Sequence, residues 1–150
     1  MIRKATINDK DVLNNLITVF VKYEADNFDE NNHNDFKFLS YIDKRIDNSE
    51  YMVYVDEEDN KIVGFILASF MRNNVIKKTD EVKIDILYVD EEYRCKGIGT
   101  NLVNKVVDNC KSLGVKFLRI DNFVKNKEAN DLYEKLGFSP LVVERRKKLD

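Results

Sequence analysis

The sequence predicts an α/β fold in which a mixed sheet carries packed helices. Three observations support this: some segments alternate apolar and polar residues as strands do, others repeat apolar residues at helical spacing, and the two kinds follow one another along the chain. Apolar residues make up 43% of the 150 residues and charged residues 35%, which excludes a disordered or fibrous chain. A chain of this length buries a sizeable core, so we expect a single domain over residues 1–150.

The first half of the chain predicts three strands and two helices. Residues 2–7 indicate a short strand, after which Asn8 or Asp9 caps a helix whose apolar face is formed by Val12, Leu13, Leu16, Ile17 and Phe20. After an acidic, asparagine-rich stretch, a second amphipathic helix is expected, with an apolar face made of Phe36, Leu39, Ile42 and Ile46. Residues 51–55 and 62–71 have strand patterns on either side of a polar turn, which predicts a hairpin.

The next strand, expected over residues 82–89, carries an irregularity. Apolar residues alternate at Val82, Ile84 and Ile86, and then the alternation slips by one residue between Ile86 and Leu87. A strand that keeps one face buried accommodates such a slip with an extra residue, a β-bulge, and bulges often lie beside functional sites. The alternative is that both faces of the strand are covered and the slip has no structural meaning.

The last third of the chain predicts two further helices and two strands. The first helix ends at Gly114, and its apolar face consists of Leu102, Val103, Val106, Val107, Cys110 and Leu113. A strand over residues 115–120 follows. Asn126 is then expected to cap a helix that ends at Gly137 and presents Ala129, Leu132, Tyr133 and Leu136. Residues 138–143 are expected to form a last strand, and the basic run at residues 145–148 a solvated edge that prevents strand pairing.

Charge, histidine and cysteine content exclude several classes of function. The 25 Lys and Arg residues nearly balance 27 Asp and Glu residues, so we expect no general nucleic-acid binding. The single histidine, His33, excludes multi-histidine metal sites, so no metal is expected. Cys95 and Cys110 are too few for a disulfide framework, which favours a reducing compartment. The longest apolar stretch, residues 62–71, is about half the ~20 residues that span a bilayer, and no signal sequence is recognised; we expect a cytoplasmic protein without membrane contact.

The loop before the third predicted helix carries the clearest chemical signal. It holds two glycines, Gly97 and Gly99, and two cations, Arg94 and Lys96. A helix N-terminus offers unpaired N–H groups and a partial positive charge, and glycine lets the backbone approach an anion closely or take a positive φ. The loop therefore predicts a site for a phosphate-bearing ligand, most naturally a pyrophosphate. A Walker A loop is excluded because no lysine follows the second glycine, and a dinucleotide fingerprint because Leu102 replaces its third glycine. The alternative is a glycine-rich helix entry with incidental cations.

Two motifs stand at a fixed separation in the second half of the chain. The strand with the slip precedes Arg94-Cys95-Lys96-Gly97-Ile98-Gly99, and a helix and a strand later comes Asn126-x-x-Ala129-x-x-Leu132-Tyr133. Together they resemble the GNAT N-acetyltransferase superfamily, whose loop motif is Arg/Gln-x-x-Gly-x-Gly/Ala. The resemblance is strongest over residues 82–138 and extends by element order over the chain. It implies a GNAT-like fold, with a mostly antiparallel central sheet, a bulged and splayed central strand pair, and helices on both faces.

The resemblance implies acetyl-coenzyme A as cofactor and acetyl donor. The loop amides would hold its pyrophosphate, through Arg94, Cys95, Lys96, Gly97, Ile98, Gly99 and Thr100. The bulged strand would pair its backbone with the pantetheine arm at Leu87, Tyr88 and Val89, where one amide also polarises the thioester carbonyl. Asn126 and Ala129 of the second motif would contact the arm near its thioester end.

The same resemblance gives Tyr133 the role of general acid, which protonates the departing thiolate of coenzyme A. A phenol has an ordinary pKa of about 10, but the thiolate is basic enough to take its proton. The alternative is a core aromatic residue, since Tyr133 lies on the apolar face of its helix. The general base is less clear, because Lys83 stands where histone-type members carry glutamate. Asp85 and Glu81 share that strand face by alternation and are the candidates, acting directly or through water.

The acidic stretch at residues 24–35 bears on the acetyl acceptor. It contains five carboxylates and no Lys or Arg, namely Glu24, Asp26, Asp29, Glu30 and Asp35. In GNAT enzymes the connection between the first two helices usually lines the acceptor side of the cleft. A negative wall there would attract a cationic amine, whether a small molecule or a peptide, with Tyr23 and Phe28 adding cation–π contact. The alternative is a solvated connector.

The leading hypothesis is therefore an enzyme that moves an acetyl group from acetyl-coenzyme A to a primary amine by direct attack. The alternative is a non-catalytic module of the same fold that binds acyl-coenzyme A as a sensor or partner. The presence of Tyr133 and Asn126 favours chemistry, because a binding module needs only the phosphate loop. A homodimer is compatible with the resemblance, since dimers are common in the superfamily.

Overall fold

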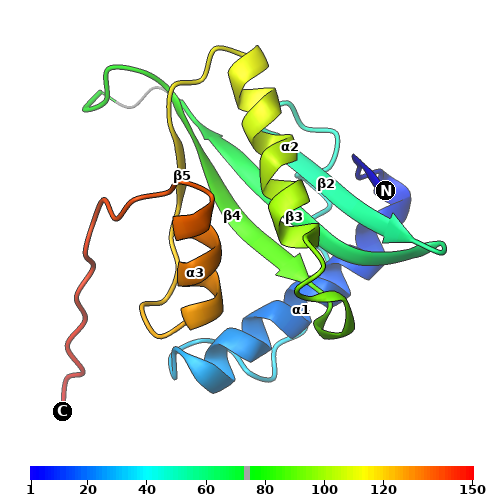
Figure 1. The fold of residues 1–150 in the computed structure, drawn as a ribbon. Helices are drawn as coiled ribbons and strands as arrows, with labels where there is room; N and C mark the ends of the chain where they lie inside the picture. Colours follow the sequence, from blue (N-terminus) through cyan, green and yellow to red (C-terminus); the bar gives the residue numbers. More distant parts are fainter. Residues whose placement is uncertain (73–74) are drawn as a thin grey trace.

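A five-stranded sheet lies at the centre of the computed structural model, which describes residues 1–72 and 75–150 (Figure 1). Its strands, in spatial order within this described part, are β1 (Ile2–Lys4), β2 (Tyr51–Glu58), β3 (Lys61–Met71), β4 (Glu81–Val89) and β5 (Leu118–Ile120). Neighbouring strands are antiparallel except for β4 and β5, which are parallel. The predicted hairpin joins β2 to β3 through Asp59 and Asn60, whose φ angles of 49° and 63° are positive, as a tight hairpin turn requires.

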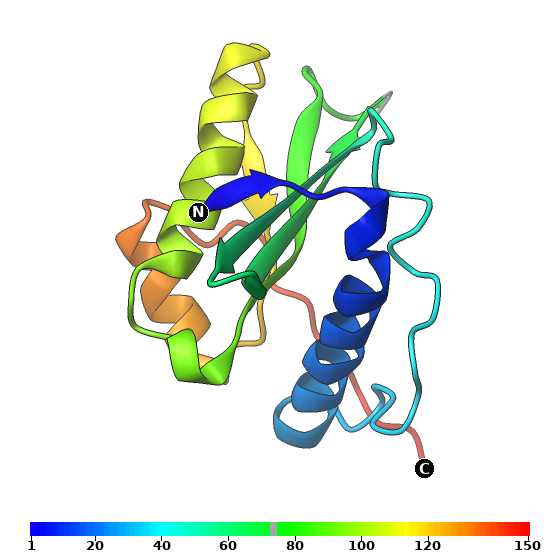
Figure 2. The same cartoon turned by 90° about the vertical axis from the view of Figure 1, so that its right-hand side faces the viewer.

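Helices cover both faces of the sheet (Figure 2). α1 (Lys10–Asn27) packs on one face, while α2 (Ile98–Ser112) and α3 (Lys127–Lys135) lie on the other. Short 3-10 turns, η1 (Ile7–Asp9) and η2 (Glu91–Tyr93), precede α1 and α2. The sheet thus separates two apolar cores, one against α1 and one against α2, and the predicted mixed α/β fold is confirmed.

The predicted irregularity of β4 is a bulge at Asp85. Leu67 of β3 pairs with Ile86 and its neighbour Ala68 pairs with Ile84, so Asp85 is the extra residue. Before the bulge the even-numbered side chains of β4 pack against α2, and after it they pack against α1. The slip predicted after Ile86 therefore begins one residue earlier. The sequence pattern misplaced it because apolar side chains cover both faces of the strand beyond the bulge.

β4 and β5 diverge at the bulge. The strand predicted over residues 115–120 forms only as the three-residue β5. Its parallel pairing with β4 runs from Val82–Leu118 to Ile84–Ile120 and ends there. Within the described residues, the half of β4 beyond Asp85 consequently has no strand along its β5 side, which is the splayed pair that the family resemblance implied.

The second amphipathic helix predicted around residues 36–46 is absent, and turns and bends take its place. The buried side chain of Asn14 on α1 explains the difference. Its amide donates to the carbonyl oxygen of Leu39 at 3.1 Å, and its own carbonyl oxygen accepts from the N–H of Ile42 at 3.0 Å. Because α1 satisfies these backbone groups, the segment buries Ile42 and Ile46 without forming a helix, while Leu39 is left exposed.

The last strand predicted over residues 138–143 is also absent. The C-terminal segment has no regular secondary structure and extends away from the sheet towards the end of α1 (Figures 1 and 2). There Arg146 pairs with Asp29 at 2.6 Å, and Lys148 pairs with Glu30 at 3.2 Å. The basic run therefore contacts the acidic stretch instead of protecting a strand edge.

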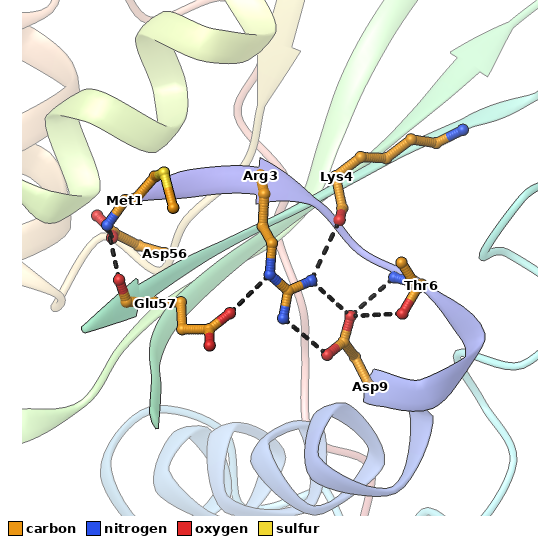
Figure 3. Close-up of polar contacts among 7 residues, drawn as sticks. All are labelled: Met1, Arg3, Lys4, Thr6, Asp9, Asp56 and Glu57. Atoms are coloured by element: carbon orange, nitrogen blue, oxygen red, sulfur yellow. Dashed lines mark hydrogen bonds and ion pairs between the residues drawn. The ribbon is translucent and has the colours of Figure 1, made fainter. Parts of the chain in front are cut away.

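The first strand is shorter than predicted because a polar cluster turns the chain after Lys4 (Figure 3). The carboxylate of Asp9 accepts from the backbone N–H of Thr6 at 2.7 Å and forms two bonds with the Arg3 guanidinium, at 2.9 and 3.0 Å. Arg3 also donates to Glu57 of β2 at 2.6 Å. The Arg3 guanidinium holds the pKa of Asp9 below its ordinary value. The cluster thus joins β1 and β2 to the start of α1.

Replacing Asp9 by alanine is expected to lower the free energy of unfolding by about 2–3 kcal/mol at neutral pH, because hydrogen bonds to charged groups contribute about 1.5–3 kcal/mol. The pKa of Asp9 is lowered in the folded state, so its contribution is present above the ordinary carboxyl pKa and is lost as the pH falls through the folded-state value. Urea unfolding at neutral and acidic pH measures both effects. The control is Asp11→Ala, which removes an exposed carboxylate from the first turn of α1; equal losses for the two variants would contradict the prediction.

Candidate active site

A cleft of about 680 Å³ lies where β4 and β5 diverge, between α1, α2 and α3. Its volume is within the range of ligand pockets. The cleft gathers most of the residues that the sequence predicted for the site, namely Tyr23, Leu87, Tyr88, Val89, Arg94, Cys95, Gly97, Ile98, Gly99, Thr100, Asn126, Ala129 and Tyr133. A second cavity, of about 320 Å³ beside Phe70 and Leu113, contains none of these residues and lies at the other end of α2.

The N-terminus of α2 opens into the cleft. Gly97 is its N-cap, with a φ of 83°, and provides no side chain to bond the first helical N–H groups. The first backbone hydrogen bond of the helix runs from the N–H of Asn101 to the carbonyl oxygen of Gly97, at 2.9 Å. The N–H groups of Ile98, Gly99 and Thr100 therefore have no acceptor within the helix. A Cβ atom added at Gly97 would meet nothing within 4 Å, so the N-cap of α2 borders open space, which leaves room for an anion there.

Two further residues of the loop, Cys95 and Gly99, have different backbone conformations. Cys95 takes a positive φ of 61°, which is uncommon for a residue with a side chain and marks a constrained turn. Gly99 lies within α2, and a Cβ there would make ordinary contacts, 3.5 Å from Leu132 and 3.7 Å from Val89. At Gly99, α2 therefore lies close to both α3 and β4.

Arg94 connects three walls of the cleft. Its Nε donates to the carbonyl oxygen of Val89 at 3.1 Å, and its guanidinium carbon lies 5.5 Å from the centre of the Tyr23 ring on α1. Lys96 does not line the cleft, and its ammonium lies 4.9 Å from the centre of the Tyr93 ring. Of the two loop cations, Arg94 thus lies in the site and Lys96 lies outside it.

The free half of β4 presents backbone groups to the cleft at every second residue. The N–H of Asp90 donates to Val63 at 2.8 Å, which makes Val89 a non-hydrogen-bonded position of the ladder with β3. The N–H and C=O groups of Val89 and Leu87 therefore point away from β3, whereas those of Tyr88 point towards it. Arg94 already occupies the carbonyl oxygen of Val89. Of the three predicted residues, Leu87 and Val89 offer backbone groups to an extended ligand, and Tyr88 offers only its side chain.

Tyr133 lies on α3 at the wall of the cleft and is only 9% exposed. Its ring contacts Phe138 edge-on at 5.7 Å. Burial raises the pKa of its phenol well above the ordinary value, and the negative charges of Asp121 and Glu24 raise it further. The hydroxyl consequently stays protonated at all physiological pH values, as a proton donor must. The ring packing expected of a core residue and the cleft position expected of an acid are both present.

Asn126 is the predicted cap of α3. Its side-chain oxygen accepts from the N–H of Ala129 at 3.1 Å. That bond fixes the carboxamide at the start of the helix, where both residues line the cleft. A bound ligand would therefore meet the amide nitrogen of Asn126 as a donor.

The structure brings neither of the predicted general bases into the cleft. Glu81 lies at the far end of β4, is buried, and pairs with Arg119 at 3.4 Å. Asp85 is exposed at the bulge; surrounding protein raises the pKa of its carboxyl, although a hydrogen bond from Ser69 opposes the rise. Both carboxylates fall outside the residues that line the cleft. The sequence placed the bulge after Ile86, whereas it lies at Asp85 itself, and the part of β4 that borders the cleft begins only beyond it.

Of the acidic stretch, the carboxylate that lines the cleft is Glu24, near the end of α1. Partial burial raises the pKa of Glu24 to about 7, and the charges of Asp121 and Asp29 contribute to the rise. In the sequence, Glu24 stands out only as a member of the acidic stretch. Its spacing could have singled it out, because it continues the inner face of the helix formed by Leu13, Ile17 and Phe20.

The remainder of the acidic stretch does not form the free negative wall that the sequence predicted. Asp26, Asp29 and Glu30 lie outside the cleft, and each pairs with a cation at 3.2 Å or less, their partners being Lys22, Arg146 and Lys148 respectively. Two of these cations come from the C-terminal segment, which the sequence placed elsewhere. The Arg146 guanidinium lowers the pKa of Asp29.

Aromatic rings link the cleft to this charged surface. Phe28 stacks on Phe123 at 5.6 Å and contacts Tyr23 edge-on at 5.7 Å. Tyr23 lines the cleft, whereas Phe28 is not one of the residues that line it. The predicted aromatic contribution is thus reduced to Tyr23, with Phe28 as its support.

In the part of the chain that the structure describes, no helix is both long and apolar enough to cross a membrane. The same residues contain no group of three or more His, Cys, Asp or Glu side chains placed to hold a metal ion.

Comparison with known proteins defines the class to which this fold and cleft belong. Residues 17–138 match the model of the acetyltransferase (GNAT) family, and the chain belongs to this family. The family resemblance that the loop motif and the Asn126–Tyr133 motif carried is therefore confirmed.

Individual relatives give the extent of the similarity. Over 57% of its length the chain is 34% identical to an uncharacterized N-acetyltransferase, MJ1207, of Methanocaldococcus jannaschii, and over 53% it is 36% identical to the thialysine N-epsilon-acetyltransferase of Bos taurus. These matches span 38% and 46% of the two relatives, so the chain covers less than half of each. The BH1408 protein of Bacillus halodurans shares the fold, with a TM-score of 0.89, 21% identity and 99% coverage of both chains.

Proposed function

We propose that the protein is an acetyl-coenzyme A-dependent N-acetyltransferase that acetylates a primary amine by direct attack. The observation that carries the proposal is the composition of the cleft. It combines the open N-terminus of α2, the free edge of β4 and the buried phenol of Tyr133. Membership of the acetyltransferase family supports the same donor and reaction.

The residues present fit the donor. The N–H groups of Ile98, Gly99 and Thr100, together with Arg94, would hold the pyrophosphate, because a helix N-terminus stabilises negative charge. The backbone groups of Leu87 would bind the pantetheine arm as an added strand does. When bound, acetyl-coenzyme A supplies an acetyl group activated as a thioester. Tyr133 would then give its proton to the leaving sulfur.

The acceptor is proposed to be an amine that enters along the α1 side of the cleft. Tyr23 provides an aromatic face there, and a relative named as a thialysine N-epsilon-acetyltransferase is consistent with an amine acceptor. A cationic acceptor, whether a small molecule or a peptide, would also have to compete with Arg146 and Lys148 for Asp29 and Glu30. Neutral and cationic amines therefore belong in the same screen.

Acetyl-coenzyme A is expected to stabilise the fold by about 2.7 kcal/mol at 100 times its dissociation constant. Thermal unfolding with and without the donor measures this. Thiol release from acetyl-coenzyme A in the presence of lysine, spermidine, an aminoglycoside and a lysine-containing peptide then measures transfer. An unchanged unfolding temperature would contradict the proposed donor, and stabilisation without thiol release would favour the non-catalytic binding module.

A further inference from the structure

We propose that Glu24 is the general base that deprotonates the acceptor amine. This inference rests on the proposed function. The acceptor amine needs a proton acceptor, and neither carboxylate that the sequence predicted for this role lies in the cleft. Glu24 on α1 does lie there. Val19, Phe20, Tyr23 and Glu24 line the cleft together, which places Glu24 on the helix face directed at the site.

The Glu24 carboxylate differs from its acidic neighbours in its partners. Asp26, Asp29 and Glu30 each form an ion pair, whereas Glu24 has no ion pair and no side-chain hydrogen bond among the described residues. A carboxylate held by a cation is a weak proton acceptor, because the cation stabilises its ionised form. Asp35 also has no ion pair among the described residues but does not line the cleft, so Glu24 is the carboxylate of this stretch that is both unpaired and placed in the cleft.

The groups around Glu24 favour proton uptake near neutral pH. The charges that act on it come from Asp121, after β5, and from Asp29, after α1. Other charged or titratable groups lining the cleft are Tyr133, Glu128 and Lys135 on α3, Tyr88 on β4, and Glu91, Tyr93, Arg94 and Cys95 before α2. With a pKa of about 7, Glu24 is ionised in a large fraction of molecules at neutral pH and still basic enough to accept a proton.

Asp121 is less suited to the same role. Its carboxylate pairs with Lys83 at 3.0 Å, is 77% exposed, and does not line the cleft. Its negative charge raises the pKa values of both Glu24 and Tyr133. Asp121 therefore strengthens Glu24 as a base and keeps the Tyr133 phenol protonated, although it does not itself line the cleft.

Glu24 and Tyr133 divide the proton transfers between opposite walls of the cleft. The acceptor ammonium loses one proton to the Glu24 carboxylate, and the freed lone pair of its nitrogen forms a bond to the acetyl carbonyl carbon. As the carbon–sulfur bond breaks, the sulfur takes the proton of the Tyr133 hydroxyl. The nitrogen loses its second proton to the Tyr133 phenolate, and Glu24 releases its own to water. The products are the amide, the free thiol and one proton.

Glu24→Gln tests this role, because glutamine keeps the size and the carbonyl oxygen but cannot accept a proton at neutral pH. With the amine that gives the fastest thiol release in the panel above, the variant is expected to lower kcat about 10²–10⁴-fold at neutral pH. The ionisation near pH 7 should disappear from its pH–rate profile. Its dissociation constant for acetyl-coenzyme A, measured by calorimetry, should stay within about twofold, and Asp11→Asn should behave as wild type.

A second readout needs neither donor nor acceptor. Because the pKa of Glu24 is raised in the folded state, wild-type stability falls as the pH rises from the ordinary carboxyl value to about 7. Glu24→Gln lacks this loss, so its unfolding temperature relative to wild type should rise between acidic and mildly alkaline pH. A difference that does not change with pH would overturn the proposed environment of Glu24.

The outcomes separate the inference from the function on which it rests. A wild-type protein that neither binds acetyl-coenzyme A nor releases thiol overturns the proposed function and the base with it. Wild-type turnover with an unaltered pH–rate profile in Glu24→Gln overturns Glu24 alone. The proposed role of Glu24 would also be overturned if the ionisation near pH 7 disappeared from the pH–rate profile of Asp85→Asn or Glu81→Gln and remained in that of Glu24→Gln. The base would then be the carboxylate that the sequence pattern suggested.

Discussion

Replacing Tyr133 by phenylalanine is expected to lower kcat by about 10²–10⁴-fold while the protein folds and binds acetyl-coenzyme A as before. The ring remains to pack against Phe138, and only the hydroxyl that would protonate the leaving sulfur is lost. Steady-state kinetics, with single-turnover measurements to show that chemistry limits the rate, provide the measurement.

Tyr54→Phe is the matched control for this change. It removes a hydroxyl from a partly buried tyrosine that contacts Asn109 and lies outside the cleft. This variant is expected to lose some stability and to keep its kcat. An unchanged kcat in Tyr133→Phe under the same conditions would return Tyr133 to the role of a core aromatic residue.

Replacing Gly97 by aspartate is expected to weaken acetyl-coenzyme A binding about 100-fold, or ~2.7 kcal/mol. The new carboxylate would stand at the N-cap of α2, in the open space that the pyrophosphate is proposed to fill. Like charges brought together in a binding site cost several kcal/mol. Isothermal titration calorimetry measures the loss of affinity.

Gly97→Asn distinguishes the effect of the added negative charge from the effect of placing any side chain at this backbone position. Asparagine and aspartate have nearly the same shape, and both tolerate the positive φ of 83° at this position better than most residues. The two variants should therefore have similar unfolding temperatures, while the asparagine variant keeps most of the affinity. Equal affinity losses in both would indicate that backbone strain or size, rather than an anion at the helix N-terminus, explains the effect.

The parts of the fold that sequence reasoning predicted well are those governed by local rules. The start of α3 at Asn126 follows from side-chain capping, and the loop before α2 contains the positive φ at Gly97 that glycine tolerates. The slip in β4 indicated the bulge at Asp85 to within a residue or two, because a buried strand face constrains its own alternation. These same elements place the loop amides and Tyr133 in the cleft.

The parts that were wrong depend on contacts between segments far apart in the sequence. The helix predicted around residues 36–46 gives way to turns because Asn14, more than twenty residues earlier, bonds its backbone. Asp29 and Glu30 of the acidic stretch pair with Arg146 and Lys148, which lie more than a hundred residues away in the sequence. Glu24 differs from these, since helical spacing alone could have placed it on the inner face of α1.

The cleft beside the free edge of β4 is proposed to bind acetyl-coenzyme A through the N-terminus of α2. An NMR titration that follows backbone amide chemical shifts can test this binding residue by residue. The largest shifts are expected at Ile98, Gly99 and Thr100 and along Leu87–Val89, with none at Leu113 beside the second cavity. Shifts concentrated at the second cavity, or no saturable shifts at the start of α2, would contradict it.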